Sequence, residues 1–202
     1  MSISHEKSLI YCYQVLQNLL KITSKKAIPD PSLSTIPGNI PLFITIYTHG
    51  SEKRLRGCIG TFSPNNKTFS SCLEKYVHQA AFNDSRFSAF TANELLNNNV
   101  TLSLNVLHTF EKTNSWDDWE IGKHGTTIFF EDTNGYKRNA TFLPAVAKEH
   151  KFSKEKAIEQ LRRKAGGTPK FSGDAFLENL KVERYQSSED SMSFERFCSL
   201  GV

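Results

Sequence analysis

The spacing of apolar residues predicts a long helix at the start of the chain and strands after it. Between residues 4 and 21 the apolar positions recur every three or four residues, as in an amphipathic helix. Residues 24–41 hold four prolines and are predicted to form a connection. Residues 42–47 and 55–62 lie on either side of a turn, which predicts a hairpin. Residues 100–106 alternate between apolar and polar side chains and predict a half-buried strand.

Polar caps and glycines mark where further helices begin and end. Segments 71–74 and 91–94 have the Ser/Thr-x-x-Glu spacing of a capping box, so a helix is predicted to begin at each. Ser153 precedes an apolar stripe and is predicted to cap a helix that runs to Ala165. The pair Gly166-Gly167 is then expected to end that helix in the left-handed conformation.

The last third of the chain holds the pattern of a second hairpin. Residues 128–130 and 136–143 flank Asn134-Gly135, a dipeptide that readily adopts the positive φ angles of a tight turn. Residues 173–179 are predicted to form a turn or two of helix, and residues 180–185 a last strand.

Together these elements predict an α+β fold, in which an antiparallel or mixed sheet built from hairpins is flanked by helices. Strands and helices do not alternate regularly, which argues against a doubly wound sheet. The chain of 202 residues is long enough for a proper core, and no boundary between domains is evident. We therefore expect a single domain over residues 1–202.

The cysteines and the N-terminus indicate an intracellular protein with reduced thiols. Cys12, Cys58, Cys72 and Cys198 form no CxxC pair, and the chain is neither short nor Cys-dense as secreted disulfide scaffolds are. The sequence shows no structural metal site, signal peptide or membrane-length apolar run. We expect a protein of the cytoplasm, with the nucleus as a second compartment, and no membrane partner. No cofactor motif is present.

The charge is unevenly distributed along the chain. The net charge is +4, but residues 137–170 alone hold ten Lys or Arg against three Glu. Such a segment can contact nucleic acid or another acidic partner. It can equally be a solvated helix face balanced by acids elsewhere.

The segment with the most chemical information is Leu55-Arg-Gly-Cys-Ile-Gly-Thr-Phe62. Two glycines in one strand contradict strand propensity unless a bulge or a ligand brings other atoms close to the backbone. In a regular strand Arg56, Cys58 and Gly60 share one face, so a cation would stand near a thiol over an open floor. A nearby cation favours the thiolate, which is the reactive form of cysteine. Alternatively, Cys58 is a small core residue and the glycines serve packing alone.

Four residues outside this segment are further candidates for a site. Asp84 and Arg86 lie on a polar loop and can bridge each other or face a ligand. His124 stands between glycines and is the histidine best suited to be a general base, although a turn histidine has the same pattern. Lys164 lies near a helix C-terminus, which favours a cation for electrostatic reasons alone.

The octapeptide of residues 55–62 resembles the signature of the AMMECR-one domain family. The resemblance continues in the same order through further segments. They are residues 80–87 (AAFNDSRF), 103–107 (SLNVL), 119–125 (WEIGKHG), 140–144 (ATFLP) and 163–166 (RKAG). It covers roughly residues 5–198, essentially the whole chain.

Membership would imply an intracellular α+β domain with a larger and a smaller lobe and a cleft lined by the octapeptide. The positions that match the family near such a cleft are Arg56, Gly57, Cys58, Gly60, Thr61, Asp84, Arg86, His124 and Lys164. This chain departs from the family at Ala145, where an acidic residue is common, and at Asn105-Val106. The family implies no established reaction.

Three functions are compatible with these residues. The first is an enzyme in which Cys58 is the nucleophile, poised by Arg56 and served by His124 as the base, on a small anionic or acyl substrate. The second is a binding module that holds a small molecule or a protein segment without turnover, with Arg56 on an anionic group. The third is a nucleic-acid binder that uses residues 137–170, although motifs that read a groove are missing.

Overall fold

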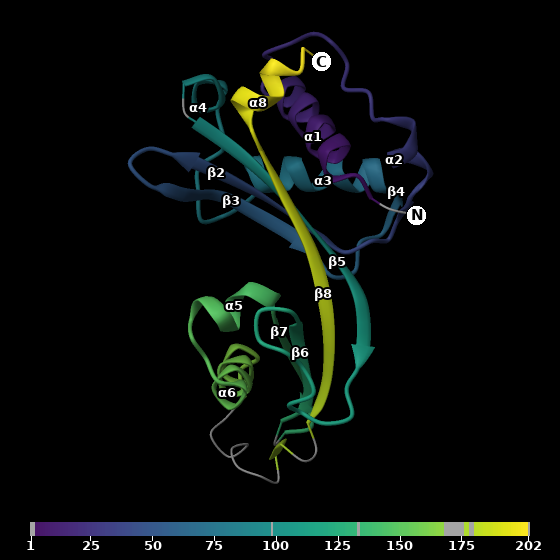
Figure 1. The fold of residues 1–202 in the computed structure, drawn as a ribbon, viewed down its shortest axis with the longest axis vertical. Coiled ribbons are helices and arrows are strands. Elements are labelled where there is room, and N and C mark those ends of the chain that lie inside the picture. The colour runs from purple at the N-terminus through teal and green to yellow at the C-terminus, as the bar shows by residue number, and fades with distance from the viewer. Residues whose placement is uncertain (1–2, 98, 133, 168–175, 178–179, 202) are drawn as a thin grey trace. The chain divides into compact units, whose positions relative to one another are not determined.

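The computed structural model describes residues 3–97, 99–132, 134–167, 176–177 and 180–201 (Figure 1). The chain divides into two compact units. The first unit comprises Met1–Leu107 and Ser188–Val202, and the second comprises His108–Ser187. The structure is α+β, as the sequence pattern predicts.

An antiparallel sheet is the centre of the first unit. Strand β2 (Leu42–His49) pairs with β3 (Lys53–Thr61) on one side and with β5 (Asn99–Lys112) on the other. Strand β8 (Lys181–Ser193) follows β5, so the order is β3-β2-β5-β8 and β3 is an edge strand. The predicted hairpin of residues 42–47 and 55–62 and the predicted strand of residues 100–106 are thus confirmed.

Two helices cover one face of this sheet. α3 (Phe69–Phe82) packs against β2 and β3, and α1 (His5–Leu19) packs against α3 (Figure 1). Leu42, Ile44 and Ile46 of β2 point into the core that these helices share, and they are fully buried. The intervening residues of β2 therefore lie on the opposite face of the sheet.

Shorter elements complete the first unit. The region predicted as a connection contains α2 (Pro31–Thr35) and β1 (Pro37–Gly38), which pairs with β4 (Asn66–Thr68). α4 (Ala92–Asn97) precedes β5, and α8 (Phe194–Ser199) follows β8.

One predicted capping box is confirmed and the other is wrong by three residues. Thr91 and Glu94 cap α4 reciprocally, with each side chain accepting the other residue's backbone N–H. α3 begins earlier than expected because Thr68 and Ser71 form the capping box. Ser71 therefore closes the box instead of opening it.

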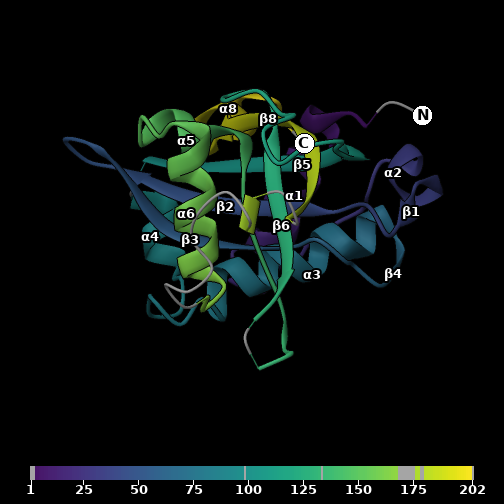
Figure 2. The same cartoon turned by 90° about the horizontal axis from the view of Figure 1, so that it is seen from below.

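The second unit contains the second hairpin. β6 (Gly125–Glu131) pairs with β7 (Lys137–Phe142) and with β8, and α5 (Pro144–Glu149) and α6 (Lys154–Lys164) pack on this hairpin (Figure 2). Gly135 has a φ of +80°, as the predicted turn requires. The Asp132 carboxylate accepts the N–H groups of the two residues on either side of that glycine.

The ends of the last predicted elements differ from expectation. Ser153 caps α6 and Gly166 has a φ of +77°, which confirms both ends of that helix. The predicted strand of residues 180–185 is longer, because β8 continues to Ser193. Most of the predicted turn at residues 173–179 lies outside the described residues.

Gly57 tests the contact between β3 and α3. A Cβ on Gly57 would lie 2.2 Å from the carbonyl oxygen of Ala80, a backbone atom that cannot rotate away. We expect Gly57→Ala to lower the free energy of unfolding by about 2 to 3 kcal/mol, the cost of overpacking a core. Chemical denaturation measures this change.

Gly50→Ala is the matched control, since nothing lies within 4 Å of a Cβ at that position. It should change the free energy of unfolding by less than about 0.5 kcal/mol. Equal effects of the two substitutions would contradict the close approach of α3 to β3.

Candidate functional site

Two side chains hold the main chain of Cys58 at the open edge of β3. The backbone N–H of Cys58 donates to Oδ2 of Asp84 at 2.9 Å, and Nη2 of Arg86 donates to the carbonyl oxygen of Cys58 at 3.3 Å. Because β3 is an edge strand, these side chains satisfy groups that a neighbouring strand would otherwise pair. We call this arrangement the Asp84–Arg86 clamp.

Asp84 is a buried carboxylate that this clamp keeps ionised. Only 5% of the residue is exposed, and it accepts hydrogen bonds from Nε and Nη2 of Arg86 at 2.9 and 2.7 Å. The hydrogen bond from Arg86, followed by the one from the Cys58 N–H, lowers the pKa of Asp84 well below its usual range. The predicted bridge between Asp84 and Arg86 is therefore present, and it also contacts the octapeptide.

Cys58 is a partly exposed residue of the edge strand. The hydroxyl of Thr45 on β2 donates to Sγ at 3.2 Å. Cys12 and Cys72 are buried, and burial raises the pKa of both thiols. Cys198 is exposed on α8. Cys58 is thus not a member of the buried core of the first unit.

Arg56 does not hold the position that a regular strand predicts. Ile46 pairs with Gly57 and Tyr47 pairs with Leu55, so Arg56 is the extra residue of a β-bulge. Its Nε and Nη2 donate to the Glu94 carboxylate at 2.5 and 3.1 Å, and its side chain is only 13% exposed. Its guanidinium is thus occupied within the first unit.

The cation that stands beside Cys58 is Arg86. Its Nη2 donates to the Cys58 carbonyl oxygen at 3.3 Å, and its side chain is 54% exposed. Its Nη1 makes no hydrogen bond within the described part of the chain. Arg86 therefore has the position that the sequence pattern predicted for Arg56.

The two glycines of the octapeptide serve close packing. Gly57 faces the backbone of α3, as described above. A Cβ on Gly60 would lie 2.3 Å from the ring of Phe43, so an aromatic side chain fills the floor that was expected to be open. Thr61 accepts the backbone N–H of Ser63 at 3.1 Å in the turn after β3.

A row of polar residues crosses the sheet on the face opposite the helices. Thr45 is the register partner of both Cys58 and Ser103. Ser103 is buried and donates to Oε1 of Glu189 at 2.5 Å, and Asn105 donates to Oε2 at 3.4 Å. The residues Thr45, Ser103 and Glu189 could not be predicted as members of this row, because their contacts depend on the pairing of strands that are distant in the sequence.

His124 and Lys164 belong to the second unit. The ring nitrogen Nδ1 of His124 accepts the backbone N–H of Glu120 at 3.0 Å. Burial, and then the charge of Arg184, lowers the pKa of His124, so its imidazole is neutral at pH 7. The hydrogen of the neutral ring therefore lies on Nε2, which makes that nitrogen a donor and argues against a base. Lys164 donates to the carbonyl oxygen of Thr141 at 3.0 Å.

Comparison with known proteins agrees with the octapeptide. A family model described as AMMECR1 matches residues 9–189. The chain belongs to the AMMECR1 family.

Proteins similar to this chain include several that are named as uncharacterised. An uncharacterised protein of Arabidopsis thaliana is 34% identical, covering 97% of this chain and 88% of its own. An uncharacterised protein of Schizosaccharomyces pombe is 31% identical and covers 93% of both chains. The crystal structure of the uncharacterised protein PH0010 from Pyrococcus horikoshii aligns with a TM-score of 0.68 at 19% identity, over 92% of this chain and 89% of that one. It supports the fold alone.

The basic segment of this AMMECR1-family chain has internal partners. Arg138 pairs with Asp132, Arg163 pairs with Glu159, and Nη1 of Arg162 donates to the carbonyl oxygen of Gly167. Arg162 is itself buried. These contacts favour the interpretation of a balanced helix face over that of a nucleic-acid surface.

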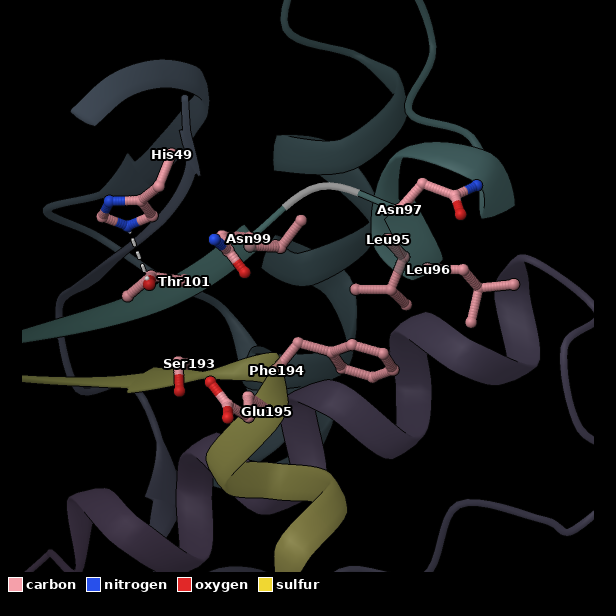
Figure 3. A pocket seen from close by; sticks show the side chains of 10 residues that line it. His49, Leu95, Leu96, Asn97, Asn99, Thr101, Ser193, Phe194 and Glu195 are labelled. Carbon is pink, nitrogen blue, oxygen red and sulfur yellow. Dashed lines mark hydrogen bonds between the residues drawn. The ribbon is translucent and has the colours of Figure 1, made fainter. Parts of the chain in front are cut away.

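A hollow of about 670 Å³ in the first unit is lined by none of the predicted site residues, and Figure 3 shows the side chains that do line it. One side is apolar, with Leu95, Leu96 and Phe194. The other side carries polar residues, among them His49, whose Nε2 lies 3.0 Å from the Thr101 hydroxyl. The family resemblance gives no role to these residues.

Within the described residues, no group of three or more His, Cys, Asp or Glu side chains could hold a metal ion. Within the same residues, none of the helices is long and apolar enough to cross a membrane.

The Asp84–Arg86 clamp predicts a stability that depends on pH. We expect Asp84→Ala to lower the free energy of unfolding by about 2 to 3 kcal/mol at neutral pH, because a charged acceptor of several hydrogen bonds is removed. The pKa of Asp84 is lowered in the folded state. Its contribution is therefore complete above the unfolded value of about 3.9 and is lost as the pH falls through the folded value.

Denaturation of the natural protein and of Asp84→Ala between neutral pH and pH 3 measures the difference between their free energies of unfolding. This difference should become smaller as the pH falls. Asp190→Ala removes an exposed carboxylate and serves as the control. A difference at Asp84 that stays constant down to pH 3, or that matches the control, would show that the clamp is not ionic.

Proposed function

We propose that the surface around Cys58 binds the anionic group of a small molecule or a peptide, with Arg86 as the cation that holds it. The observation that carries this proposal is a half-exposed guanidinium that is fixed against the main chain of Cys58, a partly exposed residue. An arginine whose fork is already oriented loses little conformational freedom when it binds a carboxylate or a phosphate.

The charges of the clamp are arranged so that the cation is the accessible half. Both oxygens of Asp84 accept hydrogen bonds from Arg86 or Cys58, and the carboxylate is buried. The guanidinium reaches the surface, and Nη1 has no partner among the described residues. An incoming anion would therefore meet donors before it meets the Asp84 carboxylate.

A second candidate function is covalent chemistry at Cys58. The Thr45 hydroxyl donates to the sulfur, which holds the thiol on this face of the sheet. We propose that Cys58 attacks the carbonyl carbon of an acyl substrate that Arg86 holds: a sulfur–carbon bond forms, the bond from that carbon to the leaving group breaks, and the leaving group takes the thiol proton. His124 is a poor base for it, because Nδ1 of its ring already accepts the Glu120 N–H. Whether the protein is an enzyme is a separate question from whether it binds an anion.

The thiols also suggest where this function operates. A partly exposed free cysteine is stable in a reducing compartment. We therefore propose the cytoplasm as its compartment, with the nucleus as a second one.

Alkylation of Cys58 by a charged and a neutral reagent tests the anion site. Iodoacetate carries a carboxylate and iodoacetamide does not, so the ratio of their rates reports local attraction for an anion. We expect this ratio at Cys58 to exceed the ratio at exposed Cys198 about fivefold, the factor that corresponds to roughly 1 kcal/mol of attraction. Mass spectrometry of the peptides measures both sites in one sample.

Substitutions distinguish the effect of Arg86 on this ratio of rates from the effect of the overall charge of the protein. Arg86→Gln should abolish the excess ratio, and Arg86→Lys should keep part of it because the charge remains. Arg54→Gln removes an exposed arginine of the same strand and should leave the ratio unchanged. If the ratio of the iodoacetate rate to the iodoacetamide rate is the same at Cys58 and at Cys198 in the natural protein, the proposed anion site is wrong. If Cys58 in the natural protein does not react with iodoacetamide, its proposed role as a nucleophile is excluded, whatever the ratio of the two rates.

A further inference from the structure

The second unit contains a polar pocket that shares no residue with the surface around Cys58. Its volume is about 430 Å³, and residues of the segment 111–124 line it together with Lys154 of α6 and Arg184 of β8. We call it the His124 pocket. All its lining residues belong to the second unit.

The inner part of the His124 pocket presents hydrogen-bond donors. His124 is 9% exposed, and its Nδ1 is occupied by the backbone of Glu120. Burial and the charge of Arg184 lower the pKa of the ring, which keeps it neutral and leaves the hydrogen on Nε2. Nε2 makes no hydrogen bond within the described residues. Nε2–H of this largely buried ring is therefore a donor that an acceptor bound in the pocket can engage.

Arg184 provides a second donor close to the first. Its Nε donates to Glu111 at 3.0 Å, and its Nη1 donates to the Asp118 carboxylate at 2.6 Å. These two contacts fix the plane of the guanidinium, and Nη2 has no hydrogen-bond partner within the described ranges. His124 and Arg184 together suit one or two oxygen acceptors.

The outer part of the pocket is acidic. The side chain of Glu120 is 67% exposed and lies 3.5 Å from Lys123, a long contact for an ion pair. Asp117 is exposed as well. The lining contains four carboxylates, from Glu111, Asp117, Asp118 and Glu120, against the three cations Lys123, Lys154 and Arg184. A simple anion would be repelled at this rim, and a simple cation would leave the inner donors unpaired.

We propose that the His124 pocket binds a small zwitterion, with its carboxylate on Nε2–H of His124 and on Arg184, and its ammonium group at the acidic rim. A ligand with both charges satisfies the inner donors and the outer acids at once. This site is independent of the Cys58 surface.

Nuclear magnetic resonance of the histidine side chains tests the site on the full chain. The probes are glycine, β-alanine and 4-aminobutyrate, compared with acetate and methylammonium, which each carry one of the charges. We expect at least one zwitterion to shift the His124 ring signals saturably, and acetate and methylammonium to bind about fivefold to tenfold more weakly, as loss of an ion pair implies. The signals of His5, His49, His78, His108 and His150 should not move.

Variants test each half of the pocket. Asp117→Asn with Glu120→Gln should reduce zwitterion affinity to that of acetate without weakening acetate binding. His124→Gln should abolish binding, whereas His150→Gln, which changes an exposed histidine of the same unit, should retain it. If His124→Gln does not fold, the rim variant still decides the matter. An absence of shifts at His124 with all three zwitterions overturns the site, and equal binding of acetate and the best zwitterion overturns the ligand class.

Discussion

The contact between the Asp84 carboxylate and the main chain of Cys58 determines how the rest of the candidate site is built. β3 is an edge strand, so its outward N–H and carbonyl groups need partners. Asp84 and Arg86 supply them at Cys58 from the loop that follows α3. The same contact buries a negative charge and orients a guanidinium toward the surface. Structure and candidate chemistry thus depend on one carboxylate.

The glycines make that contact possible without lining the site. Gly57 lets the last turns of α3 approach β3, since any side chain would collide with the carbonyl of Ala80. Asp84 lies two residues after the end of α3, so the approach of the helix also brings the loop to the strand. The octapeptide therefore serves to pack β3 closely against α3 and to form a bulge, and it leaves Cys58 at the edge of the sheet.

Much of the fold was predictable because local patterns and tertiary structure agree. The alternation in β5, the Asn134-Gly135 turn, the Ser153 cap and the Thr91–Glu94 box all behave as local chemistry predicts. The start of α3 was not predictable, because two capping boxes are possible there. The one formed by Thr68 and Ser71 is present, and the one predicted from Ser71 and Glu74 lies three residues later. The continuation of β8 to Ser193 is a long-range effect, because residues 186–193 are polar except for Met192 and show no apolar alternation.

The candidate site was predictable in its residues and less so in their roles. Cys58, Asp84 and Arg86 come together as the family resemblance implies. Arg56 was assigned to the ligand from a regular strand and from the family resemblance, whereas the structure places it at a bulge with its guanidinium on the Glu94 carboxylate. His124 was assigned as a base from its flanking glycines. A hydrogen bond to Nδ1 cannot be read from sequence, and that bond makes the residue a donor.

Hydrogen exchange at the Cys58 amide tests the central claim most directly. If Asp84 accepts this N–H as a neighbouring strand would, exchange in the natural protein should be slowed at least about a hundredfold relative to the amide of Ser51 in the β2–β3 turn. Exchange at Cys58 as fast as at Ser51, under conditions where the core of β2 remains protected, would contradict the account.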